Sequence, residues 1–170
     1  MPVSEQDHIR GNSDAPVTLL EYGDYECPDC EHAAPIVNQL RNAFAEKLRF
    51  VFRHFPQSTV HPHASAAAQA AEAAGSQGRF WDMHDILFKH QKDLIDHDLT
   101  HFAVLIGLEL YRFGAEMSSE RFARRVREDY DSGVKSGVKG TPTFFINGKR
   151  YRGAVTIEAM SEALGASIPV

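Results

Sequence analysis

The two cysteines of this chain stand three positions apart, in the sequence Cys27-Pro28-Asp29-Cys30. In the first turn of a helix, residues at this spacing share one face and lie close enough to form a disulfide. Cys27 would lie at the helix N-terminus, where unpaired backbone N–H groups and the helix dipole favour a thiolate and lower the thiol pKa. Cys30, one turn further in, would be shielded and suited to resolving a mixed disulfide. The spacing therefore predicts a redox-active dithiol in which Cys27 is the attacking sulfur.

Three alternatives compete with this interpretation. The cysteines could be inert core residues, or the chain could be an interaction domain that keeps them without turnover. They could also form half of a zinc site completed by histidines, the candidates being His32, His54, His61 and His63. The chain has no second CxxC and no histidine pair at zinc-finger spacing. Redox chemistry without a metal or other cofactor is therefore the favoured hypothesis, and an external partner must reset the pair.

Length and composition exclude several other classes of protein. The chain has 170 residues, 43% of them hydrophobic, so it can bury the core of one domain. Its formal net charge of −5 argues against general binding to nucleic acids or anionic membranes. The segment 1–16 contains no apolar run typical of a secretory signal, and no stretch is long enough to span a membrane. We therefore expect a cytoplasmic protein, or an envelope or extracellular one if a leader was removed.

The elements around the cysteines follow the order strand, helix, strand. Residues 17–22 are apolar and β-branched and are closed by Gly23, which is typical of a buried strand. Helical spacing of apolar residues follows from about 27 to 47, with Pro28 suited to the first helical position and Pro35 expected to kink the helix. The alternating segment 49–55 predicts a second strand.

The middle and the end of the chain differ in character. Residues 58–138 show helical patterns that predict an insert of about four helices, beginning with the alanine-rich segment 64–74. Residues 143–146 then predict a strand, and Asn147-Gly148 predicts a hairpin turn with a return strand over 149–152. A short helix over 157–164 ends the pattern, which belongs to the α/β class.

Two separate motifs resemble the DsbA-like branch of the thioredoxin superfamily. The first runs from Asp14-Ala15-Pro16-Val17 through Gly23-Asp24-Tyr25-Glu26 into the CxxC segment, and the second is Gly140-Thr141-Pro142-Thr143-Phe144-Phe145-Ile146-Asn147-Gly148. The resemblance covers essentially the whole chain. It implies a thioredoxin-like core (β-α-β … β-β-α), about 14–56 and 139–170, with a helical insert at about 57–138 between the second and third core strands.

The resemblance also implies roles for individual residues. Cys27 is similar to the exposed nucleophile of this family and Cys30 to its resolving thiol. Thr141-Pro142 is similar to the loop whose cis-proline faces the cysteines, with the Thr141 backbone free to pair with an extended substrate, although residue statistics alone favour a trans proline. Glu21 matches a buried acid that exchanges a proton with the resolving cysteine, whereas the residues alone also allow an exposed carboxylate. The implied partners are protein or low-molecular-weight thiols and a separate redox partner.

Asp29 is a departure from DsbA, which carries a histidine at this position of its CPHC motif. A carboxylate about 6 Å from the Cys27 thiolate, at an effective dielectric constant near 40, costs about 1.4 kcal/mol, or about one pKa unit. That energy corresponds to about 30 mV, so we expect a milder oxidant than DsbA. His61-Pro62-His63 is expected to be a solvated turn, and the arginine-rich segment 121–127 a solvated helix face.

Overall fold

A central five-stranded sheet organises the molecule, as a computed structural model describing residues 2–169 shows. The strand order is β1-β3-β2-β4-β5. The middle pair, β2 and β3, is parallel and the other neighbours are antiparallel. The strands are β1 (His8–Gly11), β2 (Val17–Gly23), β3 (Leu48–His54), β4 (Thr143–Ile146) and β5 (Lys149–Arg150).

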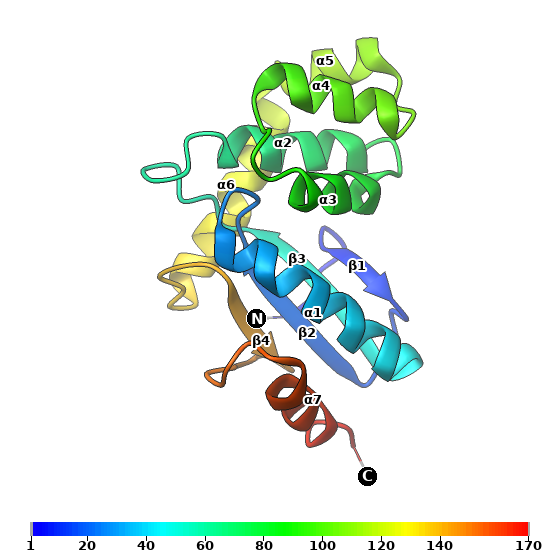
Figure 1. Ribbon diagram of the computed structural model, residues 1–170, viewed down its shortest axis with the longest axis vertical. Coiled ribbons are helices and arrows are strands. Elements are labelled where there is room, and N and C mark those ends of the chain that lie inside the picture. The colour runs from blue at the N-terminus through cyan, green and yellow to red at the C-terminus, as the bar shows by residue number, and fades with distance from the viewer. Residues whose placement is uncertain (1, 170) are drawn as a thin grey trace.

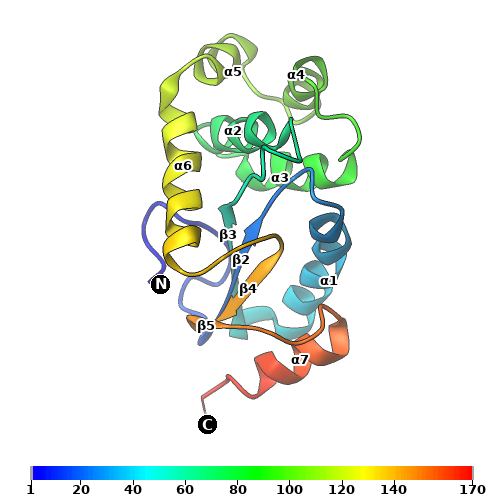
Figure 2. The ribbon, with the colours of Figure 1, turned by 90° about the vertical axis from the view of Figure 1, so that its left-hand side faces the viewer.

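Helices cover both faces of this sheet. The helices α1 (Pro28–Phe44) and α7 (Ile157–Gly165) lie on one face, and α6 (Glu120–Lys135) lies on the other, as Figure 2 shows. The α1 helix and a single 3₁₀ turn at Ala45–Lys47 form the crossover that a parallel β2–β3 pair requires. The α/β class and the β-α-β order around α1 expected from the sequence are present.

The remaining helices stack beyond one end of the sheet (Figure 1). They are α2 (Ala64–Gly75), α3 (Phe80–Lys89), α4 (Asp96–Leu105) and α5 (Leu110–Met117). Their buried side chains belong to the same hydrophobic cluster as those of α1 and α7. The seven alanines buried on α2 allow its neighbours to approach closely. Where the helical insert begins and ends as a separate unit, expected at 57 and 138, stays a prediction.

Alternation along β2 determines which side chains face α1. Val17 and Leu19 belong to the cluster on the α1 face, and Leu20 and Tyr22 belong to the cluster on the α6 face. Since successive side chains of a strand point to opposite faces, Glu21 shares the α1 face with Leu19. A carboxyl group is thereby placed on the same side of the sheet as the two cysteines.

Two details of the expected fold were wrong. The strand β1 was not predicted, because its four residues include only one large apolar side chain and its pairing partner β3 lies far away in sequence. The segment expected to hold about four helices holds five, since the helical pattern of apolar residues from Phe102 to Leu110, expected to form one helix, is divided between α4 and α5. Gly107, with a φ of +75°, breaks that pattern, and the Glu109 carboxylate accepts the first N–H groups of α5.

Candidate active site

A tight turn between β2 and α1 brings Cys27 to the mouth of the helix. Gly23 ends the strand where a Cβ atom would lie 2.3 Å from the Phe52 ring, so no larger residue fits without a shift. The Asp24 carboxylate accepts the N–H of Glu26 at 2.8 Å, and the Cys27 N–H donates to the Asp24 carbonyl at 3.2 Å. Cys27 is then the N-cap of α1, and Pro28 occupies the first helical position without losing a hydrogen bond.

The sulfur of Cys27 lies in surroundings that favour its negative charge. Both cysteines are free thiols, and the Cys30 thiol donates a hydrogen bond to the Cys27 sulfur, which is the largest influence on its pKa. The backbone N–H groups of Cys30 and Asp29 also point at this sulfur. Together with a hydrogen bond from the Thr141 side chain, they lower the pKa of Cys27 to about 5, against partial burial, which raises it. At neutral pH the group is therefore a thiolate.

Cys30 and Glu21 occupy the opposite kind of environment. Cys30 is fully buried, and burial raises its pKa well above the usual range, with a further increase from its hydrogen bond to Cys27 and from the Glu21 charge. Glu21 is 2% exposed and its Oε1 atom has no hydrogen-bond partner. Burial, and then the charge of Cys27, raise the pKa of Glu21 to about 8. Glu21 is thus the buried acid, and not an exposed carboxylate at a strand edge.

The loop before β4 closes the site from the other side. The Thr141–Pro142 peptide bond is cis, as the resemblance implied and residue statistics did not. The Cys27 sulfur lies 3.3 Å from the Thr141 carbonyl oxygen, to which the thiol donates a hydrogen bond when it is protonated. The Thr141 hydroxyl in turn accepts from the Gln57 amide at 2.9 Å. Residues more than a hundred positions apart in sequence are therefore in direct contact at the reactive sulfur.

One expectation about the CxxC segment needs correction. Cys27 was expected to be exposed, but only 5% of the residue is accessible, because the cis-proline loop and the chain around Gln91 cover it. The influence of the Asp29 carboxylate on the thiolate stays a prediction. The Asp29 side chain is exposed at the surface, and its backbone N–H donates to the Cys27 sulfur and stabilises the charge.

The segment His61-Pro62-His63 forms the partly exposed turn expected before α2, but both histidines also contact acidic side chains, which was not expected. His61 Nδ1 lies 2.7 Å from Asp24 Oδ2, and His63 Nδ1 lies 2.9 Å from Glu26 Oε1. The acids are those of the turn that precedes Cys27, so both histidines are tied to the reactive end of α1. Burial opposes the charge of His61, but the hydrogen bond and charge of Asp24, and then the charge of Cys27, raise its pKa.

A third acid–histidine contact lies in the interior rather than at the cysteines. Within residues 2–169, the group of three side chains whose geometry could hold a metal ion is His54, Glu72 and Asp129, with ligand atoms within 4.8 Å of one another. Neither cysteine belongs to it. Glu72 Oε1 is already in contact with His54 at 2.9 Å and with His8 at 3.0 Å, and Asp129 is paired with Arg125. The group therefore joins β1, β3, α2 and α6 by internal contacts.

A dithiol at a helix mouth, opposite a cis-proline and inside this architecture, defines a thioredoxin-fold redox protein. A family model described as "Thioredoxin" matches residues 3–166, and the chain belongs to this family. Among solved structures, oxidised BdbD from Bacillus subtilis is 25% identical, with a TM-score of 0.88 over 98% of this chain and 95% of that one. A thioredoxin-like oxidoreductase from Silicibacter pomeroyi DSS-3 is also 25% identical, with a TM-score of 0.86 over 96% and 93%. The chain thus has the architecture of thioredoxin-like oxidoreductases of this family.

Curated relatives are more similar in sequence but much longer. The chain is 49% identical over 160 residues to the Na(+)/H(+) antiporter NhaA 1 of Salinispora arenicola, which covers 94% of this chain and 24% of the antiporter. A protein with the same name from Mycobacterium sp. strain KMS is 42% identical over 164 residues. The chain therefore spans about a quarter of the length of the curated relatives it matches. None of its own helices within residues 2–169 has the length and apolar character needed to cross a bilayer.

Proposed function

We propose that this domain exchanges disulfides with protein or low-molecular-weight thiols through the Cys27–Cys30 pair. The observation that carries the proposal is the opposed ionisation of two contacting thiols. The pKa of Cys27 is lowered to about 5 while that of Cys30 is raised well above its usual range. A thiolate is both the attacking species and the better leaving group in disulfide exchange. Cys27 is thus a reactive thiolate, whereas Cys30 remains a protonated thiol until it resolves the mixed disulfide.

The exchange follows from these roles when the domain acts as an oxidant. A substrate thiolate attacks the Cys27 sulfur of the Cys27–Cys30 disulfide, and the bond between the two cysteines breaks. Cys30 leaves and takes up a proton, since its raised pKa disfavours a free thiolate. A second substrate thiolate then attacks the substrate sulfur of the mixed disulfide, and Cys27 leaves as a stable thiolate. The substrate loses two electrons and gains a disulfide, and the domain becomes a dithiol.

Glu21 is the proposed source and acceptor of the proton at Cys30. Its pKa of about 8 keeps the carboxyl group protonated near neutrality, ready to donate. Its Oε1 atom is buried and has no hydrogen-bond partner. When the reduced domain acts on a substrate disulfide, the reverse transfer, from the Cys30 thiol to Glu21, would activate Cys30 to attack the mixed disulfide at Cys27.

Thr141 and Pro142 are the proposed substrate-binding residues. The Thr141 carbonyl already contacts the Cys27 thiol, so a peptide paired with this backbone would have its own sulfur close to Cys27. Pro28 and Asp29 are the proposed tuning residues. Pro28 begins the helix whose N–H groups face the sulfur, and Asp29 supplies one of those groups.

The direction of electron flow depends on how strongly the reduced form is stabilised. A Cys27 pKa of about 5 lies between the values of about 7 for thioredoxin and about 3.5 for DsbA. We accordingly propose a reduction potential between about −270 mV and about −120 mV, which makes the domain a milder oxidant than DsbA. Such a potential suits an oxidase in an oxidising compartment and an exchanger of specific disulfides in the cytoplasm.

Equilibration of the domain with glutathione buffers tests the proposal, with the Cys27–Cys30 disulfide measured after acid quenching. A potential in this interval, together with catalysed disulfide exchange in a scrambled-substrate assay, would support it. A pair that remains a dithiol under all buffers, or that shows no exchange, would contradict it. Stoichiometric zinc that survives mild chelation would instead favour the metal-binding alternative.

A membrane transport protein is a second candidate partner. Domains similar to this one make up about a quarter of chains named Na(+)/H(+) antiporters. The Cys30→Ser variant, which cannot resolve its mixed disulfides, would trap natural substrates in cells. Recovery of an antiporter among the trapped chains would support this candidate, and its absence among otherwise abundant adducts would contradict it.

A further inference from the structure

A groove beside the candidate active site has no assigned role. It lies between the loop that follows β3 and the helix α6, with a volume of about 460 Å³. The loop contributes Phe55 and Gln57, α6 contributes Arg127 and Tyr130, and Lys139 lies at the end nearest the cis-proline loop. The groove is thus formed by residues of the insert and of the core together.

This groove is continuous with the backbone at which a substrate is proposed to bind. Gln57 lines the groove and donates its side-chain N–H to the Thr141 hydroxyl at 2.9 Å. The Thr141 carbonyl accepts the hydrogen bond from Cys27 at 3.3 Å. Lys139 precedes Thr141 by only two residues. An extended peptide whose cysteine reaches Cys27 therefore has its neighbouring residues within reach of the groove.

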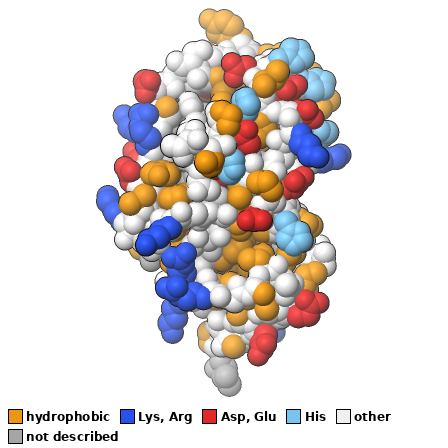
Figure 3. Space-filling view, turned by 60° about the vertical axis from the view of Figure 1, so that its left-hand side comes forward, with side chains coloured by type: hydrophobic (Ala, Val, Ile, Leu, Met, Phe, Trp, Pro, Cys, Tyr) orange, Lys and Arg blue, Asp and Glu red, His pale blue; other side chains and the backbone are white. Residues whose placement is uncertain are grey.

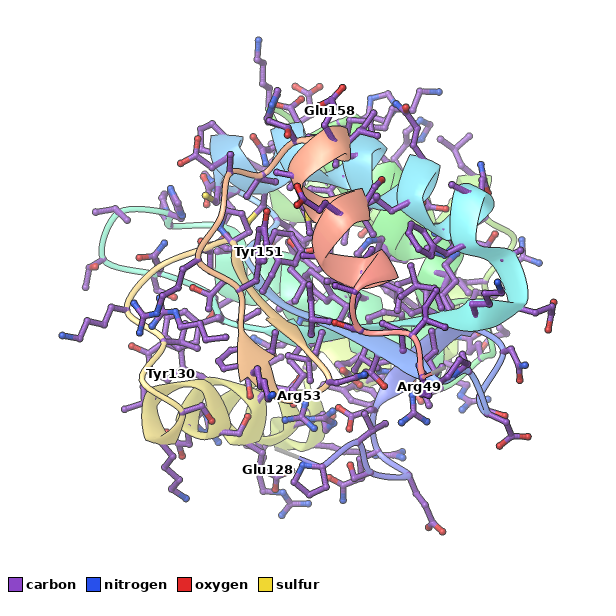
Figure 4. All side chains as sticks on the ribbon, turned by 90° about the horizontal axis from the view of Figure 1, so that it is seen from below. Arg49, Arg53, Glu128, Tyr130, Tyr151 and Glu158 are labelled. Carbon is purple, nitrogen blue, oxygen red and sulfur yellow. The ribbon has the colours of Figure 1, made fainter. Side chains whose placement is uncertain are left out.

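The charge of the groove is opposite to that of the chain. The whole chain has a formal net charge of −5, yet the described residues that line the groove include Arg127 and Lys139 and no carboxylate. Arg127 contacts Glu120 at 3.3 Å, but that carboxylate is 90% exposed and lies outside the groove lining. Tyr130 and Glu128 lie on opposite sides of α6 in Figure 4, so this neighbouring acid points away from the groove. In Figure 3, Lys and Arg side chains gather at the lower left, whereas most acidic side chains lie elsewhere on that face.

Apolar side chains form the floor of the groove. Phe55 and Tyr130 stack with ring centroids 4.4 Å apart and an angle of 18° between the rings. Tyr130 is 38% exposed and Val134, one turn further along α6, is 51% exposed. Exposed apolar side chains beside a polar rim are typical of a protein-binding surface.

We propose that this groove binds the residues next to the reacting cysteine of a protein substrate and favours a segment with apolar and acidic side chains. The apolar side chain would pack on Tyr130, and the carboxylate would pair with Arg127 and Lys139. This proposal rests on the thiol–disulfide exchange proposed above. It assigns substrate selection to the surface between the insert and the core, whereas the chemistry stays with the cysteines.

Two synthetic peptides test this selection. Each carries one cysteine as a mixed disulfide with thiopyridine and a leucine nearby, and they differ only in having glutamate or lysine on both sides of the cysteine. Release of the coloured thione reports the attack by the reduced domain. Each rate is divided by that of the same protein with 2,2′-dithiodipyridine, a neutral disulfide too small to occupy the groove.

The wild-type domain is expected to react about fivefold faster with the glutamate peptide, the size expected from two partly exposed ion pairs. The variant with both Arg127→Glu and Lys139→Glu should lose or reverse this preference. The matched control carries Arg121→Glu and Arg124→Glu, which change the net charge equally on exposed positions of the same helix outside the groove lining. It should keep the preference.

Three results would overturn the proposal. The wild type could show no preference, the groove variant could keep it, or the control variant could lose it as well, which would indicate the overall charge rather than the groove. A failure to react with dithiodipyridine is a different result, because it removes the thiol–disulfide exchange itself and this inference with it. Loss of the preference for the glutamate peptide in the groove variant, with a normal rate toward dithiodipyridine, would support the proposed role of the groove.

Discussion

The two sides of the dithiol show how one helix turn can hold two thiols of opposite character. Cys27 faces outward to the N–H groups of α1, the cis-proline loop and the His61–Asp24 pair. Cys30 faces inward to the buried Glu21 carboxyl. Helix dipole and hydrogen bonds lower one pKa, and desolvation raises the other. The fold creates the difference by placing the cysteines at the boundary between the helix mouth and the core.

Removing either sulfur should have the largest effect and should separate the two sides. Cys27→Ser is expected to lower exchange by at least about a thousandfold, because no thiolate attacks or is attacked. Cys30→Ser should still react once with a substrate disulfide but then accumulate a mixed disulfide at Cys27. Single-turnover kinetics and mass spectrometry distinguish these outcomes. Equal adduct formation at residue 30 in the Cys27→Ser variant would contradict the assigned order.

Glu21→Gln should slow the step at Cys30 by about a hundredfold, the usual size of a general acid–base contribution. Its effect should vanish for reactions that need only Cys27, such as alkylation by iodoacetamide. The comparison of alkylation with turnover therefore tests whether Glu21 acts on the inner sulfur alone. Equal slowing of both reactions would mean that Glu21 supports the site only structurally.

The same variant should also alter stability in a pH-dependent manner. The pKa of Glu21 is raised from 4.5 to about 8 in the folded, reduced protein. The folded state therefore holds this proton more tightly than the unfolded state, and stability falls as the pH rises from 4.5 to 8. Glu21→Gln should thus stabilise by about 1–3 kcal/mol at pH 8 and by little at pH 4.5. Urea unfolding of the reduced proteins at both pH values measures this difference, and an equal effect at both would contradict it.

Local chemistry explains which parts of this site could be predicted from sequence. The N-terminal position of Cys27 follows from the strand before it and from Pro28, and the turn at Asn147-Gly148 has the two positive φ angles, 47° and 78°, that this dipeptide favours. The contacts of His61 and His63 could not be predicted. Their acids lie 37 residues earlier, and only the packing of α2 against the sheet end brings them together. The groove at Tyr130 could not be predicted either. In the helical pattern of α6, Tyr130 occupies a position that is typical of a core residue.

The reactivity of Cys27 should follow its own ionisation on the acidic side. A pKa of about 5 predicts a nearly constant rate of alkylation from pH 6 to 8 and a fall of about tenfold per pH unit below 5. The lowered pKa of Cys27 also stabilises the folded, reduced protein. This contribution is fully present above the pKa of the thiol in the unfolded chain, and it is lost as the pH falls through 5. Iodoacetamide kinetics with the thiolate absorbance as a second readout measure the midpoint. A midpoint near 8 or 9 would mean that the helix mouth does not activate this sulfur.

His61→Asn should cause the smallest change. It tests whether the His61–Asp24 pair contributes to the low pKa of Cys27. The substitution removes a cation close to the Cys27 thiolate and leaves the Asp24 carboxylate with backbone N–H donors but no cationic partner. Both changes disfavour the thiolate, so the pKa of Cys27 should rise by about half a unit, and alkylation at pH 5 should slow about twofold. His63→Asn is the matched control, because His63 is bonded to Glu26 and its side chain is 42% exposed. It should shift the midpoint less. An unchanged or lower pKa in the His61 variant would show that the helix N–H groups and Cys30 alone set the charge of the reactive sulfur.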